Sequence, residues 1–184
     1  PARTLGALGG IVASRVAREL RLGGPSLTVS AEDASGLRAL EVATRLLQRG
    51  EADCMVVGAV DLAGDPRAVV ATDALRPWTR TVPRPLQPGA DGPAVGEGAA
   101  ALVLKRLEDA ERDGDPILAV LRGFGGAQDG WGEALGAALA EAGVPAGRLG
   151  FVELAAGGEP GADRAEVEAL IVAIEGGEAP ARSP

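Results

Sequence analysis

One apolar run constrains the fold of this chain more than any other feature of its sequence. Within residues 53–62, no polar side chain interrupts Cys54-Met55-Val56-Val57-Gly58-Ala59-Val60. A strand with one face in water alternates apolar and polar residues, so an unbroken run of this length predicts a strand covered on both faces. Such strands are typical of mostly parallel sheets, and we expect helices on both sides of this one.

Strand-like and helix-like segments alternate along the chain. Apolar residues at helical spacing predict helices over 11–22, 34–50, 107–112, 131–142 and 165–174. Short apolar runs predict further strands over 26–29, 99–104, 117–122 and 151–154. Residues 75–94 hold five prolines and several glycines, a density typical of a loop. The alternation predicts α/β layers built on a mixed, largely parallel sheet.

Composition excludes several classes of function. The 184 residues suffice for one globular domain, and their net charge of −8, with no basic stripe, argues against nucleic-acid binding. No apolar run approaches the ~20 residues that span a bilayer, so we expect no membrane segment and a cytoplasmic location. Histidine is absent and Cys54 is the single cysteine, so neither a metal site nor an internal disulfide is expected. Its apolar surroundings predict that Cys54 belongs to the core.

Three stretches, taken in order, resemble the β-ketoacyl synthases, which have a thiolase-type fold. They are Gly24-Pro25-Ser26-Leu27-Thr28-Val29 before a helix, residues 91–107 with Gly96, Glu97 and Gly98, and residues 151–170 with Asp163 and Glu166. The resemblance implies an incomplete thiolase-like layered fold (α-β-α-β-α) and one partial domain over 1–184. Its expected parts are a nucleophile-region half (1–74), a Pro/Gly loop (75–95), the start of a second half (96–174) and a flexible tail (175–184).

The positions that carry chemistry in this family differ here. An ungapped alignment puts Asp33 at the cysteine nucleophile, and a carboxylate is a poor acyl acceptor because a mixed anhydride is much more reactive than a thioester. A plainer interpretation makes Asp33 the N-cap of the following helix. Ala155 occupies the position of the first histidine, and Gly157 and Glu159 replace threonines that bind a pantetheine arm. The resemblance implies structural roles for Gly96, Glu97, Gly98, Asp163 and Glu166.

The resemblance therefore implies a domain that does not condense acyl chains. One hypothesis is a non-catalytic partner, similar to a chain-length factor, that dimerises with an active ketosynthase through the strand Ser26–Val29. A second is a malonyl-carrier decarboxylase of the loading-domain type, which a charged Asp33 would disfavour. No cofactor is expected to bind directly, although the phosphopantetheine arm of an acyl carrier protein could reach the complete assembly.

Two further motifs have competing interpretations. Gly96-Glu97-Gly98-Ala99-Ala100-Ala101 matches a dinucleotide-binding fingerprint in spacing, but that motif must open a helix, whereas a strand is expected here. The arginines Arg76, Arg80 and Arg84 form the one locally basic stretch. They indicate either a docking site for an acidic carrier protein or a solvated loop with scattered charges.

Overall fold

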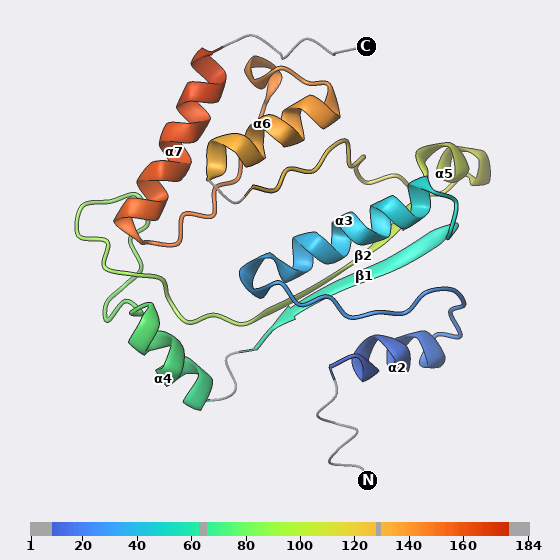
Figure 1. The fold of residues 1–184 in the computed structure, drawn as a ribbon, viewed down its shortest axis with the longest axis horizontal. Helices are drawn as coiled ribbons and strands as arrows, with labels where there is room; N and C mark the ends of the chain where they lie inside the picture. Colours follow the sequence, from blue (N-terminus) through green and yellow to red (C-terminus); the bar gives the residue numbers. More distant parts are fainter. Residues whose placement is uncertain (1–8, 63–65, 128–129, 177–184) are drawn as a thin grey trace. The chain divides into compact units, whose positions relative to one another are not determined.

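The computed structural model describes residues 9–62, 66–127 and 130–176 (Figure 1). The chain divides into two compact units, residues 1–61 with 97–120 and residues 62–96 with 121–184. The first unit contains α2 (Ile11–Glu19), the short 3-10 helix η1 (Glu32–Ala34), α3 (Ser35–Gln48), β1 (Cys54–Asp61), β2 (Gly98–Lys105) and α5 (Leu107–Asp113). The second contains α4 (Pro66–Leu75), α6 (Trp131–Ala142), the 3-10 helix η2 (Ala146–Arg148) and α7 (Pro160–Glu175).

The first unit is built on the pair of strands β1 and β2, with α3 along one face (Figure 1). The register runs from Cys54 opposite Lys105 to Asp61 opposite Gly98, and the strands are antiparallel. The sequence predicted a mixed, largely parallel sheet, and the two strands of the described residues form an antiparallel pair. Parallel neighbours need a crossover that packs on the sheet, whereas the connection between β1 and β2 carries α4, which belongs to the second unit.

Packing between α3 and β1 explains a glycine at the start of the helix. A Cβ atom at Gly36 would lie 3.0 Å from the Cβ of Ala59, so the first turn of α3 comes closer to the strand than a side chain would allow. Further along the interface, Ala43 and Leu47 of α3 are buried, as is Val57 of β1. Small side chains and backbone contact thus form this core.

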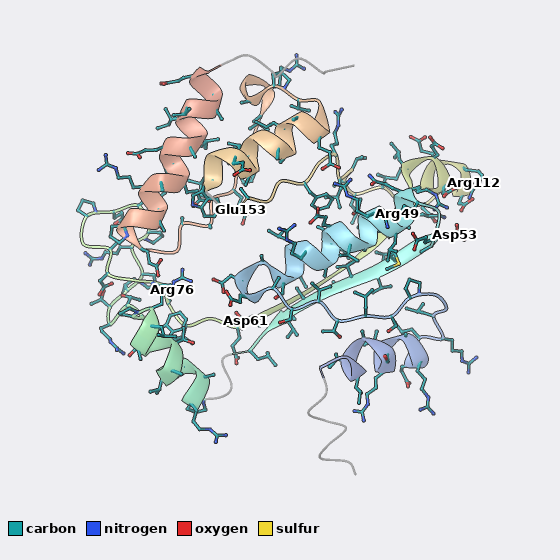
Figure 2. All side chains as sticks on the ribbon, viewed as in Figure 1. Arg49, Asp53, Asp61, Arg76, Arg112 and Glu153 are labelled. Atoms are coloured by element: carbon teal, nitrogen blue, oxygen red, sulfur yellow. The ribbon has the colours of Figure 1, made fainter. Side chains whose placement is uncertain are left out.

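A network of charged side chains surrounds the C-terminal end of α3. Arg106 donates to the carbonyl oxygens of Leu47 (3.0 Å) and Ala52 (2.7 Å), so it joins the start of α5 to the C-terminal end of α3. Its guanidinium also pairs with Asp53 and Asp109. Further ion pairs join Asp109 to Arg112, Arg112 to Asp113, and Lys105 to Asp113 and Asp115. Figure 2 shows Asp53 and Arg112 at this end of the unit.

In the second unit, α6 and α7 pack against each other, and the segment before α6 lies close to its backbone (Figure 1). A Cβ atom at Gly125 would lie only 1.7 Å from the carbonyl oxygen of Ala134, and one at Gly123 would lie 2.5 Å from that of Ala138. A side chain at residue 123 or 125 would therefore clash with the backbone of α6. The N–H of Phe124 also donates to Glu141 (2.9 Å).

The helices agree with the sequence prediction, with two changes. The pattern missed α4, although Pro66 at its first residue and Pro77 just beyond its end are ordinary helix boundaries. Helix α7 begins at Pro160, ahead of the predicted residue 165, because proline is well suited to the first turn. No helix in the described part of the chain is both long and apolar enough to cross a membrane. The tail expected at 175–184 lies almost wholly outside the described residues.

Three predicted strands do not form. Residues 26–29, 117–122 and 151–154 have no strand assignment, whereas the runs at 53–62 and 99–104 became β1 and β2. A strand requires a neighbour for its backbone groups, and none of these segments has a paired strand among the described residues. Their side chains are correspondingly exposed, with Leu118 98% and Phe151 82% accessible.

Candidate functional site

The turn that leads into α3 carries Asp33, the residue that the resemblance puts at the nucleophile position. Asp33 lies in η1 and is exposed, and the N-cap of α3 is Ala34, which forms no side-chain cap. The N-cap interpretation of Asp33 is therefore wrong, because the 3-10 turn moves the start of α3 two residues past it. The hydroxyl of Ser35 holds this turn instead: it accepts from the N–H of Ala31 (2.9 Å) and donates to the carbonyl of Glu32 (2.6 Å).

The strained backbone of this turn is at Glu32, the residue before Asp33. Glu32 has φ of 51°, a left-handed conformation that costs a residue with a Cβ roughly 1–2 kcal/mol. The turn thus presents two neighbouring carboxylates, those of Glu32 and Asp33, at the start of a helix, where the dipole favours negative charge. Sequence reasoning missed the roles of Glu32 and Ser35. The serine shortly before an amphipathic helix was the available signal.

Cys54 does not belong to the core. It is exposed at the first residue of β1. Ala59 lies next to Gly36, so its side chain is on the face of β1 toward α3. Successive side chains of a strand point to opposite faces, so Val57 shares this face and Cys54 and Val56 are on the other one. Val57 is 9% exposed and Val56 41%. The apolar run predicted cover on both faces, and the described residues supply it on one.

In the second unit, two buried carboxylates hold the turn that contains Ala155. Glu166 accepts from the N–H of Ala155 (2.7 Å) and of Ala156 (3.0 Å). Asp163 accepts from the N–H of Gly158 with both oxygens (3.1 Å each). Hydrogen bonds from backbone N–H groups to an ionised carboxylate are stronger than neutral ones. Asp163 and Glu166 thus hold the turn through its backbone N–H groups, and the side chain at 155 is a methyl group.

The Pro/Gly loop is fastened to the same turn. The N–H of Leu86 donates to Asp163 (3.2 Å), and the N–H of Gly92 donates to the carbonyl of Gly158 (3.0 Å). At Gly158 a Cβ atom would lie 2.7 Å from the carbonyl oxygen of Gly92. Arg76, at the start of the loop (Figure 2), forms an ion pair with Glu159. Residues 83 positions apart in the sequence meet here, and no local pattern could have predicted it.

The arginines of the loop are partly neutralised. Arg76 pairs with Glu159, and Arg80 pairs with Asp73. The backbone N–H of Trp78, followed by the guanidinium of Arg80, lowers the pKa of Asp73 from its usual value. Two of the three arginine charges are thus balanced by acids in the same unit, which weakens the docking hypothesis and favours the solvated-loop interpretation.

The glycine-rich segment also has a defined place. Gly98 is the first residue of β2 and pairs with Asp61, so residues 98–105 are a strand. A dinucleotide-binding fingerprint would open a helix at this point, and that interpretation is therefore wrong. Gly96 belongs to the second unit, while Glu97 and Gly98 belong to the first.

The positions singled out from the sequence thus fall into two groups. Asp33 lies in the first unit, whereas Ala155, Gly157, Glu159, Asp163 and Glu166 lie together in the second. Neither turn offers a thiol or an imidazole, and the hydroxyl of Ser35 in the first turn donates to the carbonyl of Glu32. Among the described residues, no group of three or more Cys, Asp or Glu side chains could hold a metal ion.

Comparison with known proteins shows the family to which this chain belongs. The family model "Beta-ketoacyl synthase, N-terminal domain" matches residues 2–110. The chain belongs to the β-ketoacyl synthase family. It is 41% identical over 169 residues to phthioceranic/hydroxyphthioceranic acid synthase of Mycobacterium tuberculosis, and 38% identical over 172 residues to polyketide synthase ThaQ of Burkholderia thailandensis. These alignments cover 85% and 86% of the chain but 8% of each relative.

Solved structures confirm the thiolase-like ketosynthase fold. The oxazolomycin ketosynthase domain OzmH KS7 from a Streptomyces albus strain matches with a TM-score of 0.81 and 31% identity, over 92% of this chain and 32% of that one. The ketosynthase from module 6 of the bacillaene synthase of Bacillus subtilis matches with a TM-score of 0.82 and 28% identity, over 92% and 33%. The chain thus spans about a third of these solved ketosynthase chains.

Proposed function

We propose that this chain is part of a ketosynthase-like domain that does not condense acyl chains and instead pairs with an active ketosynthase, in the manner of a chain-length factor. The observation that carries the proposal is the contrast at the two turns. Backbone hydrogen bonds to Ser35, Asp163 and Glu166 maintain both turns, while Asp33 and Ala155 occupy the positions that would do the chemistry.

The charge at the first turn supports this function over the decarboxylase alternative. Loss of CO₂ from a malonyl group requires donors directed at the enolate oxygen that develops. Glu32 and Asp33 are exposed carboxylates, which accept hydrogen bonds. At the second turn the N–H groups of Ala155 and Ala156 are already bound by Glu166. Neither turn therefore offers an available donor of the required kind.

The proposed partner is an active ketosynthase, and the proposed contact is the segment 26–29. This segment has no paired strand among the described residues, and Leu27 is exposed. An extended segment with unpaired backbone groups is suited to pairing with a strand of another subunit. In such an assembly the phosphopantetheine arm would be delivered by an acyl carrier protein to the active subunit.

The decisive experiment uses the complete parent protein, purified with its candidate partner synthase. We expect no malonyl decarboxylation above that of the partner alone, no acyl loading on this domain, and a product length that depends on its presence. Decarboxylation by this domain in a complex whose partner is inactivated would refute the proposal.

A second variant tests whether the lost residues alone explain the inactivity. The double substitution Asp33→Cys with Ala155→His should still fail to load an acyl chain, because Gly157 and Glu159 lack the hydroxyl groups of the family. Efficient loading of the double variant would show that these two positions matter less than proposed. Circular dichroism should confirm that the variant is folded.

A further inference from the structure

The side of α3 that faces away from the strands carries a groove between two rows of side chains. On the opposite side, Ala43 and Leu47 are buried where α3 packs on β1 and β2. Residues four positions apart form ridges along a helix. The groove lies between the ridge 41–45–49 and the ridge 38–42–46. Its volume is about 270 Å³, and its lining side chains all come from α3 and its C-cap: Glu41, Val42, Arg45, Leu46 and Arg49.

Three arginines follow this groove at intervals of seven and four residues. Arg38, Arg45 and Arg49 span about 16 Å of helix. The side chains of Arg38 and Arg49 are 50% and 71% exposed, and Arg49 lies at the C-terminal end of α3 (Figure 2). Arg38 pairs with Glu41 (2.7 Å), and Arg45 donates to the neutral side chain of Gln48 (3.1 Å). The groove thus carries more positive than negative charge in a chain whose net charge is −8.

An open groove on a helix is the place where a second helix packs. Helices pack by laying the ridge of one in the groove of the other, and no second helix of the first unit packs extensively on α3 among the described residues. We propose that the groove of α3 binds an acidic, amphipathic helix of a partner protein. Apolar side chains of that helix contact Val42, which is 36% exposed, and Leu46. Its carboxylates, spaced like the arginines, form ion pairs with them.

The charges around the groove favour a helix over other anionic partners. Glu41 lies in the groove, and Glu51 is 3.8 Å from Arg49. A uniformly anionic surface, such as a lipid bilayer, would meet both carboxylates, whereas a helix can place its own carboxylates at the arginines alone. A second copy of α3 would oppose arginine with arginine, and like charges across an interface reduce affinity. The complementary partner is therefore a helix with discrete acidic side chains.

The test measures binding of two helical peptides to the full chain by fluorescence anisotropy at low salt. The acidic probe is an alanine-rich, hydrocarbon-stapled peptide of about 16 residues, with leucines along one ridge and glutamates spaced like the three arginines. The basic probe has lysine in place of each glutamate. The unmodified chain should bind the acidic probe at least about tenfold more tightly than the basic one. Equal affinities for the two probes would overturn the inference.

Charge reversal within the groove should exchange the two probes. Arg45→Glu with Arg49→Glu should bind the acidic probe at least about tenfold more weakly than the unmodified chain and should bind the basic probe more tightly by a similar factor. A variant that failed to fold could not gain affinity in this way. The single substitution Arg49→Gln, at an exposed side chain, should weaken binding of the acidic probe about threefold without affecting the fold. An unchanged affinity in either variant would contradict the proposal.

A matched control comes from α2 of the same unit. Arg15→Glu with Arg18→Glu makes the same change of charge at two exposed side chains. Its affinity for the acidic probe should stay within about twofold of that of the unmodified chain, because salt screens distant charges. A loss as large as that of the groove variant would reduce the effect to net charge and overturn the inference.

Vesicles of phosphatidylserine and phosphatidylcholine are the last probe. The unmodified chain should not sediment with them. Sedimentation that Arg45→Glu with Arg49→Glu abolishes would assign the groove to a lipid surface and overturn the inference.

Discussion

At the scale of single residues, the close approach at Gly158 shows how strictly the second turn is built. Gly158 has φ of 86° and is buried, and its Cα faces the carbonyl oxygen of Gly92. Ala156, two residues earlier, adopts φ of 39° despite its Cβ. Left-handed backbone of this kind persists only where surrounding contacts hold it, and here those contacts are the carboxylates of Asp163 and Glu166.

We expect Gly158→Ala to lower the free energy of unfolding by about 2–4 kcal/mol, from backbone strain and from the clash with Gly92. Urea unfolding of the full chain would measure the change. Gly161→Ala is the matched control, because a Cβ at Gly161 meets nothing within 4 Å and alanine favours the first turn of α7. It should be neutral or stabilising by up to about 1 kcal/mol. Equal losses in the two variants would contradict this account.

At the scale of secondary-structure elements, Asp163 joins α7 to two separate segments. Its carboxylate binds the N–H of Gly158 and the N–H of Leu86, and the side chain is almost completely buried. Asp163→Ala should lower the free energy of unfolding by about 2–4 kcal/mol, because two N–H groups lose a charged acceptor. Asp163→Asn, which keeps one oxygen, should lose less. Removal of the exposed Glu168 by Glu168→Ala should cost under about 0.5 kcal/mol, and a loss comparable to that of Asp163→Ala would contradict the assignment.

The charged network around α5 should make the first unit sensitive to acid. The guanidinium of Arg112, and after it the ammonium of Lys105, lowers the pKa of Asp113 from 3.8 to about 2. A carboxyl whose pKa is lower in the folded state stabilises that state above its unfolded pKa. The contribution of Asp113 is therefore complete above about pH 4 and is lost as the pH falls toward 2.

Urea unfolding of the full chain between pH 5 and pH 2 would measure this dependence. Asp113→Asn should flatten the fall in stability within that window. Glu133→Gln, in α6 of the other unit and outside the network, is the control and should leave the curve unchanged. An Asp113→Asn curve as steep as that of the unmodified chain would contradict the role of the network.

At the scale of the whole molecule, the chain forms two units with few buried side chains. The buried apolar residues among the described parts are Ala43, Leu47, Val57, Ala110 and Ala146. Long apolar side chains that face solvent accompany the segments that failed to pair, at 26–29, 117–122 and 151–154. The sequences of these segments are typical of strands, but no neighbouring strand pairs with them among the described residues.

Hydrogen exchange should separate the paired strands from these segments. We expect the paired amides of β1 and β2 to exchange at least about tenfold more slowly than those of residues 117–121 and 151–154, because only the former donate within a ladder. Mass spectrometry of the full chain would resolve the peptides. Equal protection would show that the segments pair with something, as in an assembly of several copies.

Local pattern determined most of the helices, the strands β1 and β2, and the family to which the chain belongs. These features depend on neighbouring residues, such as the amphipathic spacing of α3, the apolar run of β1 and the order of three motifs. The same pattern indicated burial for Cys54, which is exposed, and a strand at 26–29, which has no paired strand among the described residues. Cover and pairing depend on a neighbouring segment, which a local pattern does not supply. Asp33 is not the N-cap of α3, because one extra 3-10 turn separates it from the start of that helix.

Tertiary structure alone decided how the second turn is built. Asp163 meets Leu86, Glu159 meets Arg76 and Gly158 meets Gly92, and each contact joins residues more than 60 positions apart. Such contacts leave no periodic trace, because one hydrogen bond or one missing Cβ fixes the position. The sequence by itself therefore led to the proposal that the residues of condensation are missing, whereas only the folded chain revealed that the turn around Ala155 is held by carboxylates and spanned by an ion pair.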